Sequence, residues 1–167
     1  MVSLIVRPAE PGDALAVATV HVRAWQVGYR DLLPHTYLEQ LRPEQRAARY
    51  TFGDDDPSAP QTLVACAGAR VLGFATTVFE GAHAPAELGA LYVDPDCWNC
   101  GVGRALIAAA RTRLHASGAG EAIAWLLAGN TQALRFYQRD GWRDDGTRRE
   151  DTVWGLRVAE WRLRRTL

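Results

Sequence analysis

Apolar residues recur every three or four positions in the first part of the chain, a spacing typical of helices. From residue 13 to about residue 26, this spacing predicts a helix whose apolar face is formed by Leu15, Ala18, Val22 and Trp25. Two shorter helical stretches, about residues 36–41 and 44–50, each follow a proline. Residues 53–60 (GDDDPSAP) have no periodic apolar face and predict a loop.

The pattern changes at residue 61, where strand-forming residues run together. Residues 62–66 and 71–79 are two such runs, and the turn at residues 67–70 predicts that they form a hairpin. Strand-length and helical segments then alternate: we expect strands at 87–93, 122–127 and 158–163, and helices at 103–115 and 131–138. An antiparallel front followed by a β-α-β crossover predicts one α+β domain built on a mixed sheet.

Composition agrees with a single folded domain. Of the 167 residues, 48% are hydrophobic and 23% are charged, which is ordinary for a globular protein. The 19 basic and 19 acidic residues cancel, so there is no general electrostatic case for a nucleic-acid partner. The basic run Arg162, Arg164 and Arg165 is interpreted as a solvated terminus. All basic residues are arginine, which rules out a P-loop lysine and a Schiff-base lysine.

The location expected for the protein follows from three further features. No apolar run approaches the ~20 residues that span a bilayer, and the first residues do not have a signal-peptide pattern. Three cysteines, an odd number, fit a reducing compartment better than a disulfide framework. We therefore expect a cytoplasmic protein, monomeric or homodimeric, without a membrane or nucleic-acid partner.

The segment DPDCWNCGVGRAL contains a C-x-x-C pair, Cys97 and Cys100, which is the spacing of a redox dithiol or of half a zinc site. A structural zinc site needs about four ligands, but only Cys66 remains elsewhere and no close histidine pair exists, so we expect no metal. A thiol oxidoreductase stays open as an interpretation, because its dithiol also follows a strand at the start of a helix.

Two glycines directly after the cysteines favour an anion-binding loop over a redox or zinc site. Gly101 and Gly103 allow close approach of a ligand and let successive N–H groups form an anion-binding nest. The third glycine of a dinucleotide fingerprint is absent, since Leu106 occupies that position. The pattern of strand, glycine-containing loop and helix start therefore suits a diphosphate without matching either familiar nucleotide motif.

Two motifs in order resemble the GNAT superfamily of N-acyltransferases. The sequence LYVDP at residues 91–95, followed by GVGRAL at residues 101–106, is similar to the acyl-CoA loop that this family writes as Q/R-x-x-G-x-G/A. The segment NTQALRFYQRDGW at residues 130–142 resembles the family's N-x-x-A-x-x-F-Y-x-x-x-G-F/W motif. With flanking strands the resemblance covers about residues 62–163, whereas the first 60 residues match only in their layout.

The resemblance implies a single GNAT domain over residues 1–167, with a CoA-binding core at about residues 62–142. The implied fold has α-β-α layers: a mostly antiparallel, mixed sheet of about six or seven strands, helices on both faces, and a splayed fourth and fifth strand. A β-bulge at Gly89-Ala90 is expected to open that splay for the pantetheine arm. The implied activity is transfer of an acetyl group from acetyl-CoA, the co-substrate, to a primary amine by direct attack in a ternary complex.

The residues that the resemblance assigns to CoA binding lie in the two motifs and the strand before them. A backbone N–H on that strand is expected to polarise the acetyl carbonyl. One departure is Trp98 at the position where the family has Gln or Arg, which reduces side-chain help for the phosphates unless Arg104 compensates. The assigned residues are Leu91, Tyr92, Val93, Cys100, Gly101, Val102, Gly103, Arg104, Ala105, Asn130, Ala133 and Phe136.

Acetyl transfer to an amine needs a base for the ammonium proton and an acid for the departing thiolate. Glu87, 14 residues before Gly101, occupies the place of the family's strand glutamate and is the base candidate, with Glu80 and His83 as substitutes. Tyr137 occupies the family's tyrosine position and is the acid candidate. Asn130 fits two roles equally well, a hydrogen bond to CoA or the N-cap of the following helix.

The acceptor pocket is expected between the first two helices and the loop before residue 87. Trp25, Tyr29, Glu80 and His83, together with Asp31 and His35, would line it, a set that suits a small-molecule or peptide amine. The spacing of Trp25 and Tyr29 also fits a packed core. Two other function classes remain open: a non-catalytic acyl-CoA-binding module, and the thiol oxidoreductase centred on Cys97 and Cys100.

Overall fold

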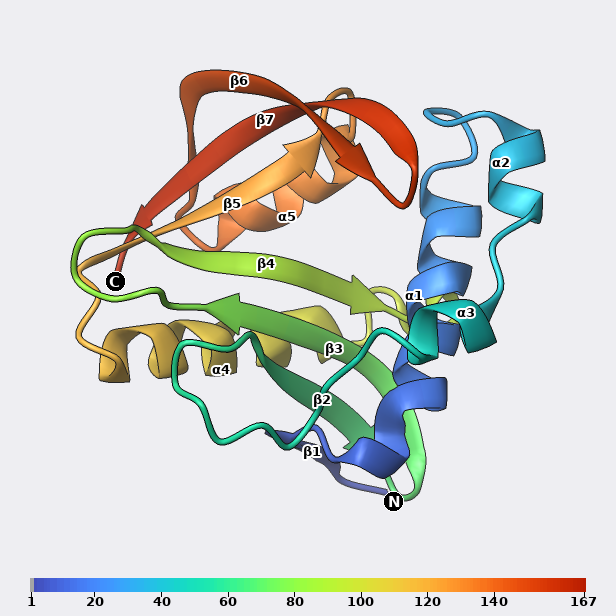
Figure 1. The fold of residues 1–167 in the computed structure, drawn as a ribbon, viewed down its shortest axis with the longest axis horizontal. Helices are drawn as coiled ribbons and strands as arrows, with labels where there is room; N and C mark the ends of the chain where they lie inside the picture. The colour runs from blue at the N-terminus through green and yellow to red at the C-terminus, as the bar shows by residue number, and fades with distance from the viewer. Residues whose placement is uncertain (1) are drawn as a thin grey trace.

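Short segments with alternating inward and outward side chains build a seven-stranded sheet in the computed structural model, which describes residues 2–167 (Figure 1). The strand order is β1-β2-β3-β4-β5-β7-β6, and only β4 and β5 pair in parallel. The predicted α+β class with a mixed, mostly antiparallel sheet is confirmed. The strands are β1 (Leu4–Pro8), β2 (Gln61–Ala67), β3 (Arg70–Val78), β4 (Ala86–Val93), β5 (Glu121–Leu127), β6 (Arg143–Val153) and β7 (Leu156–Thr166).

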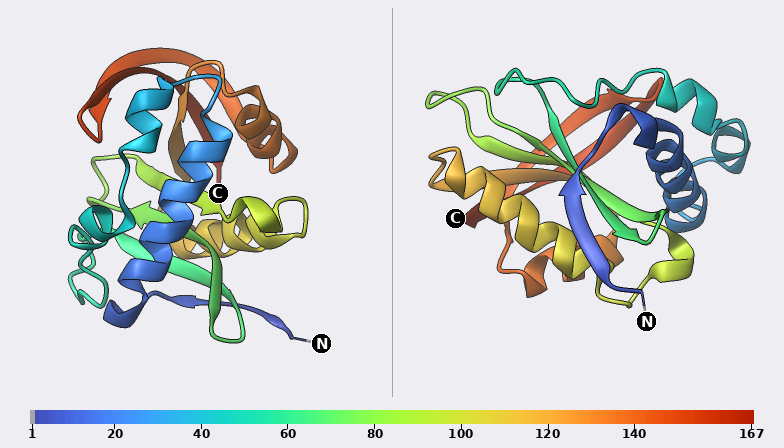
Figure 2. Two further views of the ribbon diagram at one scale, coloured as in Figure 1. Left: turned by 90° about the vertical axis from the view of Figure 1, so that its right-hand side faces the viewer. Right: turned by 90° about the horizontal axis from the view of Figure 1, so that it is seen from below.

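Helices cover both faces of the sheet (Figure 2). One face is covered by α1, with the short α2 and α3 beside it, and the other by α4 and α5, which share one apolar core over β3, β4 and β5. Among residues 2–167, none of the helices is long and apolar enough to cross a membrane. The helices are α1 (Ala14–Gly28), α2 (His35–Glu39), α3 (Pro43–Ala47), α4 (Val102–Ala116) and α5 (Thr131–Arg139), with 3₁₀ turns η1 (Pro11–Asp13) and η2 (Pro95–Cys97).

The sheet divides between β4 and β5. These strands pair at only two positions, Ala86 with Ala122 and Glu87 with Ile123, and then separate. On the other side of β4, the register with β3 shifts between Thr76 and Thr77, so Gly89 is an extra, unpaired residue. Since a bulge bends its strand, Gly89 directs the rest of β4 away from β5. The expected splay and the bulge at Gly89-Ala90 are both present.

The predicted apolar face of the first helix was partly wrong. Leu15 is 53% exposed, whereas Val17 and His21, which the prediction left out, are buried. At 100° per residue the buried face is centred near His21, and Leu15 lies at its margin. The buried members of α1 are Val17, Ala18, Val20, His21, Val22, Ala24 and Trp25.

Strand β6 was not predicted at all. Its sequence, RDDGTRREDTV, has no buried residue, because it forms the outer edge of the sheet and most of its side chains reach solvent. Apolar alternation, the signal used to find strands, requires one buried face. A tight turn at Trp154-Gly155, both with positive φ (50° and 74°), joins β6 to β7 and brings the hairpin tip to α1 and α2 (Figure 1).

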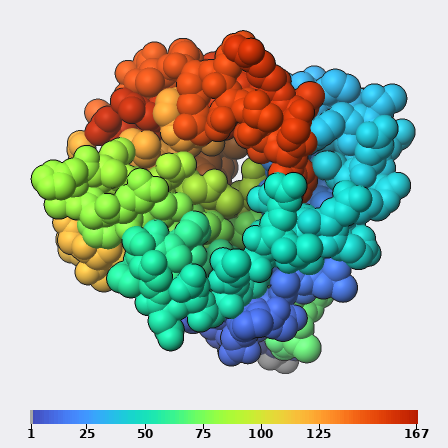
Figure 3. Space-filling view, in the orientation of Figure 1, coloured from blue at the N-terminus to red at the C-terminus, as the bar shows by residue number. Residues whose placement is uncertain are grey.

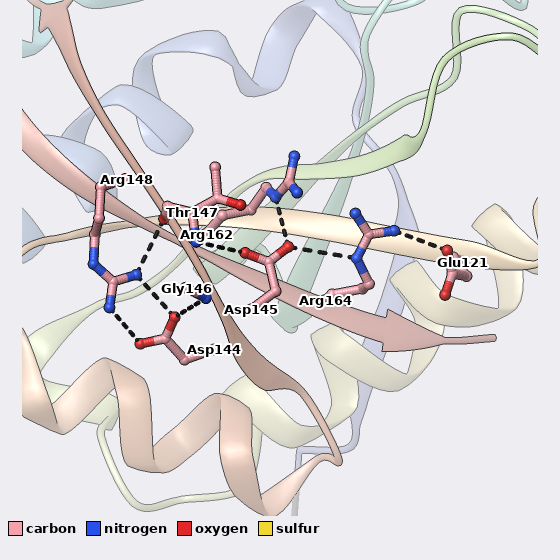
Figure 4. Close-up of polar contacts among 8 residues, drawn as sticks. All are labelled: Glu121, Asp144, Asp145, Gly146, Thr147, Arg148, Arg162 and Arg164. Atoms are coloured by element: carbon pink, nitrogen blue, oxygen red, sulfur yellow. Dashed lines mark hydrogen bonds and ion pairs between the residues drawn. The ribbon is translucent and has the colours of Figure 1, made fainter.

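The C-terminal arginines, interpreted from the sequence as solvated, are ion-paired instead. Asp145 accepts hydrogen bonds from Arg162 Nε at 2.7 Å and from Arg164 Nε at 3.4 Å, and Arg164 also reaches Glu121 on β5 at 2.8 Å (Figure 4). Arg165 lies 3.6 Å from Asp140. These contacts link β5, β6 and β7 across an otherwise polar surface.

Asp145 gives a pH-dependent prediction. Desolvation opposes ionisation, but hydrogen bonds from Thr147 and Arg162 outweigh it and lower the pKa of Asp145 to about 2. We expect Asp145→Asn to lower the free energy of unfolding near neutral pH by up to about 1 kcal/mol, because such accessible pairs contribute little. Since the folded-state pKa lies below the unfolded value, this contribution is complete above about pH 5 and lost progressively below it.

Urea denaturation of both proteins at about pH 7, 5 and 3 measures the effect, and the difference should narrow at the lowest pH. A difference that is the same at all three values would assign the role of Asp145 to backbone geometry rather than to its charge.

Candidate functional site

A cleft of about 590 Å³ opens where β4 and β5 separate, and the start of α4 and the inner side of α5 complete its walls. Most residues predicted to bind CoA lie in its lining, although they come from segments up to 45 residues apart, from Leu91 to Phe136. The predicted residues in the lining are Tyr29, Leu91, Tyr92, Val93, Gly101, Gly103, Arg104, Asn130, Ala133, Phe136 and Tyr137.

Three loop residues in the prediction are not part of the lining. Val102, the first residue of α4, is buried in the core, and Cys100 is exposed, with its thiol 3.4 Å from the Trp98 carbonyl. The N–H of Ala105 donates to the Gly101 carbonyl at 3.0 Å, so it is already used within the first helical turn. Trp25, Glu80, His83 and Glu87 also lie outside the lining, and Glu80 and His83 are exposed.

The loop before α4 presents free backbone donors. Gly101 is the N-cap residue with φ 85°, a left-handed conformation that favours glycine, and Asn99 is also left-handed with φ 60°. Because the first intrahelical bond is the one from Ala105, the N–H groups of Val102, Gly103 and Arg104 have no helical acceptor. A helix start of this kind binds anions such as a diphosphate.

Gly103 is required where α4 meets α5. A Cβ atom at this position would lie 3.1 Å from Phe136 Cε2, closer than ordinary van der Waals contact. The glycine therefore lets the helix start approach Phe136 while its N–H remains accessible from the cleft.

Trp98, which replaces the expected Gln or Arg, holds the loop before α4 in place through contacts with β4 and α1. Its indole Nε1 donates to the Val93 carbonyl at 2.9 Å. The far edge of the ring lies 3.8 Å from where a side chain at Gly28 would begin. The tryptophan thus connects the loop to the end of β4 and to α1.

Two hydrogen bonds at the end of β4 show which of its backbone N–H groups face β3 and which face β5. The N–H of Asp94 donates to Leu72 at 2.7 Å, toward β3. Backbone groups alternate along a strand, so Tyr92 also faces β3, whereas Leu91 and Val93 face the side of β5. The bond from Trp98 to the Val93 carbonyl agrees with this direction. Because β5 has separated at this level, the N–H groups of Leu91 and Val93 face the cleft.

Tyr137 is held at the cleft by α5. Asn130 caps this helix, since its side-chain oxygen accepts from the Ala133 N–H at 3.1 Å. Tyr137 is 8% exposed, and its ring meets the edges of Phe136 and Trp142 at 5.5 Å between ring centres. Burial raises the pKa of Tyr137 above its usual value, so the phenol remains protonated at neutral pH.

Glu87 lies at the point where the strands part. It is the last residue of β4 that pairs with β5, and its neighbour Leu88 is buried in the core beneath α4. Successive side chains of a strand alternate, so the Glu87 carboxyl is on the opposite face, toward α1 and the β6–β7 hairpin. Burial raises its pKa, with Arg149 opposing the shift and Glu160 adding to it.

Three residues beside Glu87 were not identified from the sequence. Glu160 is only 8% exposed and accepts from Arg149 Nε at 2.9 Å, and the Arg149 guanidinium lies 3.9 Å from the centre of the Trp125 ring. The available signal was Glu160 itself, because it follows Val158 by two residues on the inward phase of the last strand. Arg149 had no signal, since β6 was not recognised.

Aromatic side chains line the α1 side of the cleft. The hydroxyls of Tyr29 and Tyr92 are 3.2 Å apart, and both residues line the cleft. Trp25, predicted at the acceptor site, is 4% exposed and packs against Tyr29 at 5.1 Å. The space-filling view shows an opening between the β6–β7 hairpin, β4 and the α3 segment (Figure 3).

Cys97, the first residue of the C-x-x-C pair, lacks the environment of a reactive thiolate. Burial raises the pKa of Cys97, whereas a reactive thiolate needs a lowered pKa. Cys97 lies in η2, before the loop, rather than at the start of α4. Within residues 2–167, no group of three or more His, Cys, Asp or Glu side chains is arranged to hold a metal ion.

Comparison with known proteins gives one family match. The family model described as Acetyltransferase (GNAT) family matches residues 22–142. This range includes the cleft lining from Ala24 to Asp140. A search of curated proteins gives no match.

Several solved structures share the fold over the full chain. A GCN5-related N-acetyltransferase from Rhodopseudomonas palustris has a TM-score of 0.77 at 24% identity, covering 100% of this chain and 98% of that one. The PaiA N-acetyltransferase from Thermoplasma acidophilum, in complex with coenzyme A, has a TM-score of 0.74 at 18% identity, with 99% of each chain covered. YncA from Salmonella typhimurium, solved with its cofactor acetyl-CoA, has a TM-score of 0.72 at 17% identity, covering 98% of this chain and 94% of that one.

Proposed function

The chain belongs to the GNAT acetyltransferase family, and from this premise we propose that it transfers the acetyl group of acetyl-CoA to a primary amine by direct attack in a ternary complex. The observation that carries the proposal is the opening between β4 and β5. Backbone N–H groups without helical acceptors lie at one end of this opening, at the start of α4. The half-buried carboxyl of Glu87 lies on the opposite face of the sheet, toward α1. Such an arrangement lets two substrates meet within the sheet.

The residues that would hold acetyl-CoA follow from the donors of the cleft. The N–H groups of Val102, Gly103 and Arg104 suit the pyrophosphate, and the separated edge of β4 suits the pantetheine amides. Acetyl-CoA supplies an activated acetyl group. The N–H groups of Leu91 and Val93 face the cleft, where one of them can donate to the acetyl oxygen as negative charge develops.

One side chain would accept a proton, and a second would stabilise the departing thiolate by a hydrogen bond. Glu87 accepts the proton of the attacking ammonium, directly or through a water, and its raised pKa makes it a stronger base. Tyr137 donates a hydrogen bond to the departing sulfur. Because burial raises its pKa, Tyr137 acts as a donor that stays protonated rather than as a strong acid.

The proposal is tested by measuring free thiol released from acetyl-CoA across a panel of primary amines, together with calorimetry of acetyl-CoA binding. Turnover with at least one amine supports it. Binding without turnover across the panel favours a non-catalytic acyl-CoA-binding module. Dithiol redox activity without acetyl-CoA affinity would favour the thiol oxidoreductase, against which the raised pKa of Cys97 already argues.

Tyr137→Phe separates catalysis from packing. The substitution keeps the ring that packs on Trp142 and removes only the hydroxyl. We expect kcat to fall about 10- to 100-fold, the effect of losing a hydrogen bond to a charged group, while the Kd of acetyl-CoA changes little. Steady-state kinetics and calorimetry measure the two quantities, and equal losses in both would assign the hydroxyl to cofactor binding.

A further inference from the structure

Arg46 is an arginine without a counter-ion on the acceptor side of the sheet. Its guanidinium lies 4.5 Å from the centre of the Trp154 ring and 5.5 Å from that of Tyr50. Among residues 2–167 no carboxylate lies within ion-pair distance of it, and its Nε is buried without a hydrogen-bond partner. Other part-buried arginines, such as Arg111 and Arg162, are ion-paired.

Trp154, the ring under Arg46, has two unusual features of its own. It occupies a left-handed backbone conformation with φ 50°, which is strained for a bulky residue. Its indole N–H is buried and has no acceptor among the described residues. Tyr37 holds the turn in place by donating to the Trp154 carbonyl at 2.8 Å. The left-handed conformation belongs to the two-residue turn between Val153 and Leu156, and the unpaired N–H leaves one donor available beside Arg46.

These donors are connected to the cleft through one layer of rings. His21 stacks on Tyr92 and also contacts Trp154, each at 4.5 Å between ring centres. Tyr92 lines the cleft and meets Tyr29 there. The hairpin that carries Trp154, the α3 segment that carries Arg46, and β4 border the opening in Figure 3.

Two carboxylates, opposite in charge to Arg46, lie on β4 and on β7 of the hairpin. Glu87 has no ion pair within residues 2–167, whereas Glu160 beside it is paired with Arg149. Among the described residues of the acceptor side, Glu87 and Arg46 are half-buried charged groups without an ion pair, whereas Glu80 and Arg49 nearby also lack an ion pair but are exposed. An acceptor with two or more positive charges would be attracted by Glu87 but repelled by Arg46.

From this arrangement we propose that the acceptor is a small molecule of the amino-acid class, whose carboxylate is bound by the Arg46 guanidinium and the Trp154 indole N–H while its amine lies toward Glu87. The inference rests on the proposed acetyl transfer and specifies its second substrate. The guanidinium binds carboxylates through paired N–H donors, and the indole N–H supplies a further one. Carboxylate binding then satisfies donors that are otherwise unpaired.

The test compares free α-amino acids with the matching α-amino-acid amides, which keep the amine and side chain but lack the negative charge. Thiol release from acetyl-CoA gives kcat/KM for each pair. We expect the acid of at least one pair to be preferred by about tenfold or more, the effect of a hydrogen bond to a charged group. If amides or amines without a carboxylate react as well as the best acid, the acceptor assignment is wrong while acetyl transfer stands.

Variants locate the binding group. Arg46→Met keeps most of the packing on Trp154, and we expect it to lower kcat/KM for the preferred acid about 10- to 100-fold and for its amide only slightly. The matched control is Arg49→Met, since Arg49 is exposed and has no ion pair among the described residues. Trp154→Phe keeps a ring and removes the N–H, and should raise KM for the acid more than for the amide. Equal losses for acid and amide in Arg46→Met overturn the proposal.

A second readout separates this inference from the proposed function. If no amine releases thiol although acetyl-CoA binds, the catalytic proposal fails, and calorimetry of the same amino acids then tests the carboxylate site alone. Binding that is lost in Arg46→Met and kept in Arg49→Met supports the site. Absence of binding by every amino acid in the panel overturns it.

Discussion

Replacing Glu87 by Gln should lower kcat/KM for amine acetylation by about 10²- to 10⁴-fold, the contribution of a positioned general base. The amide has nearly the shape of the carboxyl but cannot accept the ammonium proton. Glu87 lies where β4 and β5 part, and burial makes it a stronger base than an exposed carboxylate by raising its pKa. The substitution removes this chemistry without opening a cavity.

The pH profile distinguishes a base from a binding residue. A base is inactive below its pKa, so kcat/KM of the native enzyme should rise with pH through the raised pKa of Glu87. In Glu87→Gln this limb should disappear, and the residual activity should follow only the ionisation of the amine. Thiol-release assays from about pH 5 to 9 measure both profiles.

Stability gives an independent control for the same variant. A carboxyl whose pKa is raised on folding binds its proton more tightly in the folded state, so its ionisation weakens stability as the pH rises above the unfolded value. Glu87→Gln should therefore be at least as stable as the native protein at neutral pH, although it is nearly inactive. Glu80→Gln, at an exposed neighbouring residue, should leave activity within about twofold. If instead Glu80→Gln causes the larger loss, Glu80 is the base.

The largest effect on folding is expected at Trp142. Its side chain is 1% exposed and belongs to the core that α4 and α5 share with the sheet. Its Nε1 donates to Asp140 at 3.0 Å, and Asp140 is also paired with Arg111 at 2.8 Å. Trp142→Ala leaves a large cavity and should lower the free energy of unfolding by about 3–5 kcal/mol.

Urea denaturation measures this loss, with Trp161→Ala as the control because Trp161 is only partly buried on β7 and should cost less. Trp142 also supports Tyr137, whose ring meets its edge. The milder Trp142→Phe should therefore lower kcat as well as stability. Native-like stability in Trp142→Ala would contradict the packing that places Tyr137 at the cleft.

The contacts at the hairpin tip explain why the residues of the proposed acceptor site were harder to predict than the loop before α4. Trp25 and Tyr29 were expected to share a pocket, yet Trp25 is buried while Tyr29 reaches the cleft. Arg46 and Trp154 are 108 positions apart in the sequence and meet only because the β6–β7 hairpin folds back onto α1 and α3. Local periodicity contains no information about such a contact.

By itself, the sequence determined most of the secondary structure, the mixed sheet and the glycine-containing helix start at Gly101 and Gly103, where we propose that the pyrophosphate binds. These depend on short-range physics: periodic burial, glycine backbone freedom, and the free N–H groups of a helix start. The tertiary structure alone decided three matters: that Trp98 bonds to the end of β4, that β6 exists as an exposed edge, and that within residues 2–167 neither Glu87 nor Arg46 has an ion pair. Each of these depends on which distant groups come within hydrogen-bond or ion-pair distance, and only the packed chain sets those distances.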